Sequence, residues 1–173
     1  SPVLADEQAL DGNREMAEMF AADKEARKSF SPEKDWQVIE EEDRARRVRT
    51  RELLETGELT TAPDFYAAAF IFQHGDQPED YLLAHALAVR ALGLGMKQAE
   101  WIAAATLDRY LLSIEREQIY GTQYQTPRGG ETTQGRYDRD LLTDQVRSGA
   151  GVGTLEEQEA RLKKFNSPRS LEE

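Results

Sequence analysis

The sequence predicts a mainly α-helical protein of five or six helices, and three observations lead to this fold class. Apolar residues recur at helical spacing in most segments, and helix-capping residues precede several of those segments. One segment, about residues 97–115, is apolar around its whole circumference. A helix without a polar face must be surrounded by other elements, so we expect it at the centre of the fold. A small β-hairpin near residues 118–140 is the expected exception to the helical pattern.

The first two helices are expected over residues 13–29 and about 32–56. Asn13 caps the first of them, and Ser31 with Pro32 restarts the chain as N-cap and first helical residue of the second. Apolar side chains at helical spacing give the first helix one adhesive face. The second helix is dense in charge, with acids placed four residues before bases, which is the favoured order for helical ion pairs.

The apolar stripe of the second helix contains charged residues. It begins at Trp36 and ends at Leu54, but Asp43 and either Arg46 or Arg47 fall on it midway. If the stripe faces the core, these charges face inward with it. The alternative is a solvated salt-bridge face on a slightly rotated helix, and we favour this alternative.

The remaining helices begin at recognisable caps: Thr61, Asp76 with Glu79, and Thr154 with Glu157. The helix after Thr61 is apolar nearly all round, which predicts that it is buried. The helix after it stops near Gly93 and Gly95, as helices often do at glycine. SGAGVG, residues 148–153, is expected to be a flexible connector before the last, amphipathic helix.

The hairpin is predicted from a change in composition after the apolar helix. Residues 118–126, QIYGTQYQT, are rich in β-prone tyrosine, isoleucine and threonine, and PRGG follows as turn material. The strands are expected near residues 118–125 and 133–140. An isolated hairpin is marginally stable in water, so it should pack on the helices.

Three units are expected along the chain. Residues 1–30 form an N-terminal helical segment whose attachment could be loose, and residues 31–166 form a single helical domain that includes the hairpin. Residues 167–173 are expected to be a frayed tail.

Composition narrows the classes of partner. The chain has 33 acidic and 22 basic residues, a net charge of −11, and such a field repels nucleic acid and anionic lipid. No apolar run approaches the roughly 18 residues of a membrane span. We therefore expect a soluble acidic protein whose partner is a protein or a small polar ligand. The start SPVLADEQ could be the mature end of an exported domain or an arbitrary boundary within a longer chain, so compartment and oligomeric state stay open.

Few residues are suited to catalysis. The only histidines are His74 and His85, and His85 shares an apolar helix face with its neighbours. Asp108 lies on the inner face of the apolar helix, where a carboxylate needs partners because an unpaired one costs several kcal/mol. His85 and Asp108 could form an acid–base pair, or Asp108 could belong to a buried network that docks the hairpin. The spacing of the histidines and aspartates matches no metal-ligand pattern, so we expect no metal and no cofactor.

LDRYLLSIEREQIYGTQ, residues 107–123, carries a resemblance to a known family. It resembles an uncharacterised bacterial domain-of-unknown-function family, in which a Leu-Asp-Arg helix precedes a Gln-[Ile/Leu]-Tyr-Gly-Thr-Gln motif. The resemblance implies no activity. The residues that it places at motif positions are Asp43, Arg47, His74, Asp108, Arg109, Gln118, Tyr120, Gly121 and Gln123.

The sequence alone leaves the function unknown, with three hypotheses open. The first is a non-catalytic binding or interaction module with a polar pocket between the apolar helix and the hairpin. Its predicted lining is Asp43, Arg47, His85, Asp108, Arg109, Gln118, Tyr120 and Gln123. The second is a hydrolase-like enzyme in which His85 or His74, with Asp108, activates water. The third assigns the polar cluster a purely structural role.

Overall fold

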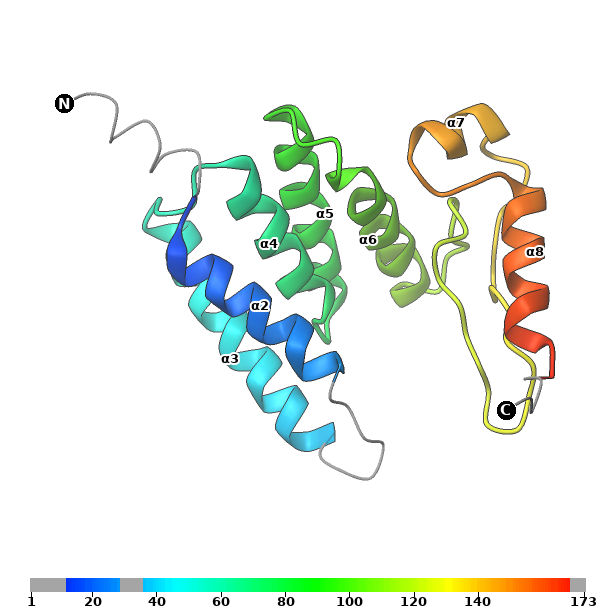
Figure 1. Ribbon diagram of the computed structural model, residues 1–173, viewed down its shortest axis with the longest axis horizontal. Helices are drawn as coiled ribbons and strands as arrows, with labels where there is room; N and C mark the ends of the chain where they lie inside the picture. The colour runs from blue at the N-terminus through cyan, green and yellow to red at the C-terminus, as the bar shows by residue number, and fades with distance from the viewer. Residues whose placement is uncertain (1–11, 29–35, 169–173) are drawn as a thin grey trace, which may run out of the picture.

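The computed structural model describes residues 12–28 and 36–168, and over these residues the protein is mainly α-helical (Figure 1). Seven helices are described, where five or six were expected. They are α2 (Arg14–Lys28), α3 (Trp36–Glu55), α4 (Ala62–Gln73), α5 (Pro78–Gly93), α6 (Ala99–Ser113), α7 (Asp144–Gly149) and α8 (Leu155–Asn166). The additional helix is the short α7, which begins where no element was predicted and runs into the predicted glycine-rich connector.

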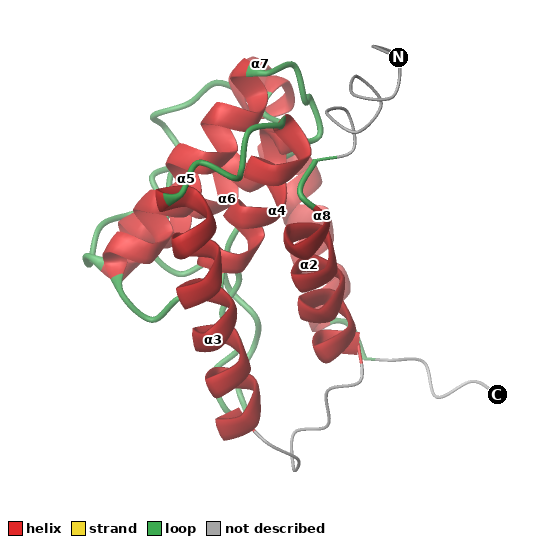
Figure 2. Cartoon of the chain, turned by 90° about the vertical axis from the view of Figure 1, so that its left-hand side faces the viewer, coloured by secondary structure: helices red, strands yellow, loops and turns green. Residues whose placement is uncertain are grey.

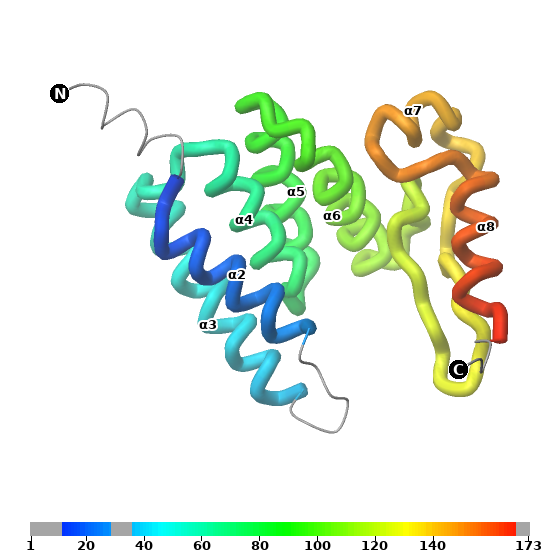
Figure 3. Tube along the Cα trace, in the orientation of Figure 1, coloured from blue at the N-terminus to red at the C-terminus, as the bar shows by residue number. Residues whose placement is uncertain are grey.

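The predicted apolar helix is α6, and it lies between two parts of the chain. On one side it packs against α5, which in turn packs against α4. On its other side are the loops that follow α6, together with α7 and α8 (Figures 1 and 3). Helices α2 and α3 lie beyond α4, at the opposite end of the molecule from α8. In this way α6 connects a helical body, α2 to α6, with a C-terminal part that consists mostly of loops.

The packing of α4, α5 and α6 depends on alanine. Each of these helices buries several alanines at the contacts, and Ala68, Ala88 and Ala99 are fully buried. Small side chains let neighbouring helix backbones approach closely, so that larger residues such as Phe72 and Ile102 fill the remaining space. Trp101 lies on the outer face of α6 and is 42% exposed, so the helix is not enclosed on all sides.

Helix α2 belongs to the same hydrophobic core as α4. Met16 is fully buried there, and the ring of Phe20 packs against Tyr66 and Phe70 with centroid distances of 5.8 and 5.1 Å. The buried carboxylate of Asp64 also joins the two segments, because it accepts a hydrogen bond of 2.6 Å from the backbone amide at the start of α2. These contacts fix the position of α2 against α4.

Helix caps were predicted correctly at three of the helices. Asn13 caps α2, because its side-chain oxygen accepts a hydrogen bond of 2.9 Å from the amide of Met16. Thr61 caps α4 and Thr154 caps α8, each in a capping box with the residue three positions later. The expected box of Asp76 with Glu79 is wrong, because the equivalent pair at α5 is Gln77 with Asp80. The expected start of α3 at Ser31 and Pro32 lies outside the described residues, as do the last five residues of the predicted frayed tail.

The charged residues in the stripe of α3 face inward, so the solvated-face interpretation is wrong. Asp43 is buried, and the side chains of Arg46 and Arg47 are each only 11% exposed. They lie toward α2 and the end of α4, where Asp43 pairs with Arg27 and Arg47 binds the carbonyl of His74. Among the described residues, no helix combines the length and the apolar character that crossing a membrane requires.

The predicted β-hairpin is also wrong. The described part of the chain contains no β-strand, and residues 118–140 form irregular loops with two isolated bridges, Gln118 to Tyr137 and Gln125 to Thr133 (Figure 2). Side-chain hydrogen bonds take the place of the regular backbone hydrogen bonds of a hairpin. The side-chain amide of Gln118 donates to the carbonyls of Gln123 and Gln134. The composition of this segment indicated extended backbone, but these side-chain bonds compete with regular strand pairing.

Gly121 turns the chain inside this loop region. Its φ is +77°, a left-handed conformation that L-residues adopt at a cost of about 1–2 kcal/mol. The residue is buried, and a Cβ at this position would overlap the side chains of Gln158 and Tyr137. Gly121 therefore allows α8 and the loop to approach each other closely.

Replacing Gly121 with alanine is expected to lower the free energy of unfolding by about 2–5 kcal/mol, because conformational strain and steric overlap add. Gly57→Ala is the matched control, since Gly57 has a φ of +74° and a Cβ added there would meet no atom within 4 Å. The control should lose only the strain, about 1–2 kcal/mol. Denaturant titration measures both variants. Equal losses would show that close packing at Gly121 contributes nothing.

Candidate functional site

The structure separates the predicted site residues into three places instead of one pocket. Asp43, Arg47 and His74 line a cleft at the ends of α3 and α4. His85 and Tyr120 line a different hollow, between α5, α6 and α7. The third group, Asp108, Gln118 and Gln123, holds the loop that follows α6, and Arg109 connects this loop with the end of α4.

The cleft has a volume of about 290 Å³ and lies between α2, α3 and the turn after α4. Its lining consists of Arg27, Trp36, Ile39, Glu40, Asp43, Arg44, Arg47, His74, Gly75 and Asp76. One wall is therefore apolar, and the remainder is charged or polar. A concave site with a few convergent polar groups is the usual form of a small-ligand site.

His74 is held by a carboxylate that was not among the predicted site residues. Its Nδ1 lies 3.1 Å from Oδ1 of Asp23 on α2, and Asp23 is buried. A carboxylate oxygen accepts, so Nδ1 donates and Nε2 is the ring nitrogen that remains available. Asp23 could have been found in the sequence, because it follows Met16 and Phe20 at helical spacing on the apolar face of α2.

Asp43 is compensated by two arginines. It accepts a hydrogen bond of 2.8 Å from Arg46 on its own helix and bonds of 2.8 and 3.2 Å from Arg27 on α2. Burial alone would raise the pKa of the Asp43 carboxyl, but the hydrogen bonds from Arg27 and Arg46 outweigh it and hold the pKa below its ordinary value. Arg27 also binds Asp23 at 2.7 Å, so this one guanidinium joins both carboxylates.

Asp23, Asp43 and His74 together have ligand atoms within 4.8 Å of one another, which is a spacing that a metal ion could use. However, Arg27 and Arg46 already occupy the carboxylate oxygens and neutralise their charge. A cation would have to displace both guanidinium groups. We therefore interpret these residues as an ion-pair network that orients His74.

Two arginines hold the C-terminal end of α4, where His74 is located. Arg47 donates from Nη1 to the carbonyl of His74, and Arg109 donates from Nη1 to the carbonyl of Gln73, both at 2.7 Å. The last carbonyls of a helix have no partner within the helix and carry partial negative charge, so cations stabilise them. Arg109 also donates from Nε to the Gln123 side chain at 3.2 Å, which connects the loop to this end.

Asp108 is fully buried and uses its carboxylate to hold the loop backbone. Oδ1 accepts from the amides of Ile119 and Tyr120, at 2.8 and 3.0 Å. Oδ2 accepts from the amide and the hydroxyl of Thr122, at 3.0 and 2.7 Å. His85 donates elsewhere, from Nδ1 to the Ala103 carbonyl at 2.8 Å. The described hydrogen bonds of His85 and Asp108 thus go to different partners, and the expected acid–base pair does not form. The partners of Asp108 all lie in the loop, so its role is to dock the loop on α6.

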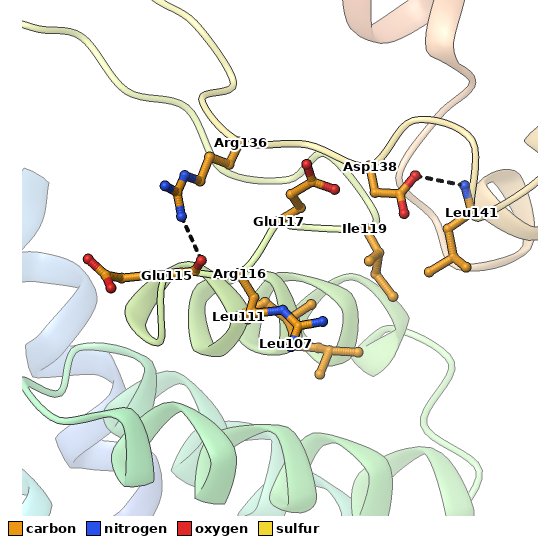
Figure 4. Close-up of a pocket in the computed structure, with 9 residues that line it drawn as sticks. All are labelled: Leu107, Leu111, Glu115, Arg116, Glu117, Ile119, Arg136, Asp138 and Leu141. Atoms are coloured by element: carbon orange, nitrogen blue, oxygen red, sulfur yellow. Dashed lines mark hydrogen bonds between the residues drawn. The ribbon is translucent and has the colours of Figure 1, made fainter.

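Among the hollows outside the cleft, two are lined by residues of α6. His85 and Tyr120 line one of about 430 Å³, together with mostly apolar residues. A larger one, of about 670 Å³, lies between α6 and two loop segments that follow it, with Leu107 and Leu111 from α6 (Figure 4). Two of its charged residues are bonded within the loops: Arg136 donates to the carbonyl of Glu115, and Asp138 accepts from the amide of Leu141. None of the predicted site residues lines this larger hollow.

Comparisons of the chain with protein-family models, with curated proteins and with solved structures found no match. The resemblance of residues 107–123 to a bacterial family therefore stays a prediction. Function is inferred from the geometry of the cleft.

Asp108→Asn is expected to lower the free energy of unfolding by about 3–5 kcal/mol, since the amide that replaces one oxygen cannot accept hydrogen bonds. Asp138→Asn is the control, because Asp138 uses Oδ1 alone to accept from the amides of Asp140 and Leu141. Asparagine can keep both of those bonds. Denaturant titration of both variants is the measurement, and a loss below about 1 kcal/mol in Asp108→Asn would contradict the docking role.

Asp43 is expected to make stability depend on pH in the acid range. Its pKa is lower in the folded protein than the ordinary value of 3.8, so the unfolded chain takes up the proton first as pH falls. The stabilisation is complete well above pH 3.8 and is lost as pH falls through the lowered pKa. The charged and titratable groups around Asp43 are Arg27 and Asp23 of α2, Arg46 of α3 and His74.

At pH 7, Asp43→Asn should cost about 1.5–3 kcal/mol of unfolding free energy, and the difference from the parent protein should shrink below pH 3.8. Glu41→Gln, at an exposed position of the same helix, should show no comparable effect. Unfolding titrations from neutral pH down to about one pH unit below 3.8 measure both. A difference that stays constant with pH would rule out the Asp43 ion pairs as its source.

Proposed function

We propose that the protein is a helical module that binds a small polar ligand in the cleft between α2, α3 and the C-terminal end of α4. The observation that supports this proposal is the convergence of Asp43, Arg47 and His74 on one cleft. Asp43 and Arg47 come from α3 and His74 from the end of α4, and the family resemblance places all three at motif positions. The binding role is non-catalytic in this proposal.

The side chains of the cleft are preorganised, which supports binding. His74 is oriented by Asp23, Asp43 by Arg27 and Arg46, and Arg47 by the end of α4. Side chains that are already fixed lose less conformational entropy when a ligand binds. Trp36 and Ile39 add an apolar wall against which the non-polar part of a ligand can pack.

A hydrolase-like enzyme is the second candidate, and the hydrogen bond between His74 and Asp23 favours it. In this arrangement Asp23 orients the ring, and Nε2 of His74 would accept a proton from a water molecule. The described lining of the cleft includes no serine, threonine or cysteine, so water would have to be the nucleophile. In this hypothesis the acid–base pair is therefore His74 with Asp23, in place of the expected His85 with Asp108.

The structural hypothesis applies to the Asp108 group and not to the cleft. All four hydrogen bonds of Asp108 go to the chain itself, and Gln118 is equally buried and bonded. We propose that these residues position the loop and do not contact a ligand.

The binding proposal is tested by ¹H–¹⁵N NMR with a panel of probes: glutamate, arginine, glucose, acetate and inorganic phosphate. At least one probe is expected to shift the amides of residues 39–47 and 74–76 in the parent protein. The shifts should weaken at least tenfold in apparent affinity in His74→Ala, because a lining side chain is lost. Glu41→Gln is the control on the outer face of α3.

If no probe shifts these amides, or if His74→Ala responds like the parent, the binding proposal is wrong. The same samples test the second candidate with p-nitrophenyl acetate and p-nitrophenyl phosphate as probes. Hydrolysis that is lost in both His74→Gln and Asp23→Asn would favour the enzyme over the non-catalytic module.

A further inference from the structure

The cleft and the groups directly beside it are rich in arginine in an acidic protein. The arginines are Arg27, Arg44, Arg46, Arg47 and Arg109, and the carboxylates are Asp23, Glu40, Glu42, Asp43 and Asp76. Five guanidinium groups thus lie near five carboxylates, whereas the whole chain has a net charge of −11. The charge at the cleft is balanced, so small anions are repelled less there than elsewhere on the protein.

Two of these arginines, Arg47 and Arg109, bind the end of α4 and have no close ion pair within the described part of the chain. Arg27 and Arg46 form close ion pairs with Asp23 and Asp43. Arg47 has a weaker counterion, because its Nη2 lies 3.6 Å from Asp76, whose side chain is 57% exposed. The ion pairs of the described residues give Arg109 no carboxylate at all, and its hydrogen bonds go to a carbonyl and an amide oxygen.

Arg47 and Arg109 also have donors to spare at neighbouring positions. They bind the carbonyls of consecutive residues, His74 and Gln73, so both guanidinium groups lie at the same end of α4. Each guanidinium has five N–H donors. Arg109 lies beside the cleft and is not part of its lining. Its Nε and Nη1 have hydrogen bonds to described residues, which leaves Nη2 for a ligand that reaches the end of α4.

We infer that the ligand of the cleft is a small organic anion whose phosphate or carboxylate group binds Arg47 and Arg109 beside His74. This inference rests on the proposed function and adds the chemical class of the ligand. Planar guanidinium groups match the oxygens of phosphate and carboxylate, and such charge-assisted hydrogen bonds are about twice as strong as neutral ones. The apolar wall of Trp36 and Ile39 would pack against the organic part.

The electrostatics of Arg109 agree with this class of ligand. Burial lowers the pKa of its guanidinium, and the positive charge of Arg27 lowers it further, while Tyr81 opposes the shift. A bound anion would compensate the charge in a place where water does so poorly. The acidic surface elsewhere disfavours polyanions, so the selectivity is for a small anion that fits about 290 Å³ and not for nucleic acid.

The test uses inorganic phosphate and acetate as probes, with sodium chloride at matched ionic strength as the reference. Phosphate or acetate should shift the amides of residues 74–76 and raise the unfolding temperature more than chloride does. A response to phosphate alone identifies a phosphate ligand, and a response to acetate alone identifies a carboxylate ligand. The apparent affinity should fall at least tenfold in Arg47→Gln and in Arg109→Gln.

Arg116→Gln is the control, because it removes the same charge at an exposed position that lines the larger hollow instead. Arg109→Lys keeps the charge and loses the planar group, and it serves as the second variant if Arg109→Gln does not fold. An affinity in Arg109→Lys within about twofold of the parent would contradict recognition by the guanidinium shape.

Failure of the inference differs from failure of the binding proposal. If both anions behave like chloride while glucose or arginine shifts the cleft amides, the ligand is not an anion but the cleft is a binding site. If no probe in the panel shifts these amides, both are wrong. Equal losses in Arg116→Gln and Arg109→Gln would show that only net charge matters, which would also overturn the inference.

Discussion

The buried carboxylate of Asp108 is the interaction on which the arrangement of the C-terminal part depends. Between residues 115 and 141 the described chain has no regular secondary structure, so it has few backbone hydrogen bonds of its own. The Asp108 carboxylate accepts hydrogen bonds from three backbone amides of this stretch and so attaches the stretch to α6. An ionised carboxylate is stable at a fully buried position when enough donors surround it, and here the loop itself provides the donors.

The same loop reaches the cleft through Gln123 and Arg109. Gln123 lies one residue beyond Thr122, which Asp108 holds, and its side chain accepts from Arg109. Arg109 in turn binds the end of α4. The residues that bind Asp108 and the residues beside His74 are thus connected by consecutive hydrogen bonds, although they belong to segments far apart in the sequence. This connection gives a physical reason why a polar motif directly follows the most apolar helix.

The sequence predicted the parts of the structure that depend on local periodicity. The inward position of Asp108 and the caps at Thr61 and Thr154 follow from spacing alone, and the structure confirms them. The prediction of the hairpin was wrong for a different reason. β-propensity describes how a side chain fits a pleated surface, but glutamine side chains and Asp108 took over the hydrogen bonds of the loop backbone.

The candidate site was harder to predict, because it depends on contacts between distant segments. Asp43 and Arg47 were selected from one helix, but nothing in their own helix indicates Asp23 or the turn that contains His74. The sequence predicted that Asp108 needs partners. The partners are mainly backbone amides, and nearly every residue has such an amide, so the amino-acid composition cannot show which residues bind Asp108. Tertiary packing decided which of the predicted residues meet.

The position of Asp23 on α2 bears on where this protein can be divided. A boundary at residue 31, which the sequence alone would suggest, separates His74 from the carboxylate that fixes its ring and Asp43 from Arg27. A shortened chain that begins there would retain α3 to α8 but would expose the apolar face that Met16 and Phe20 cover. Its cleft would then present a freely rotating imidazole and an aspartate that has lost one of its two arginines. Negative results from such a fragment would describe the truncation and not the protein.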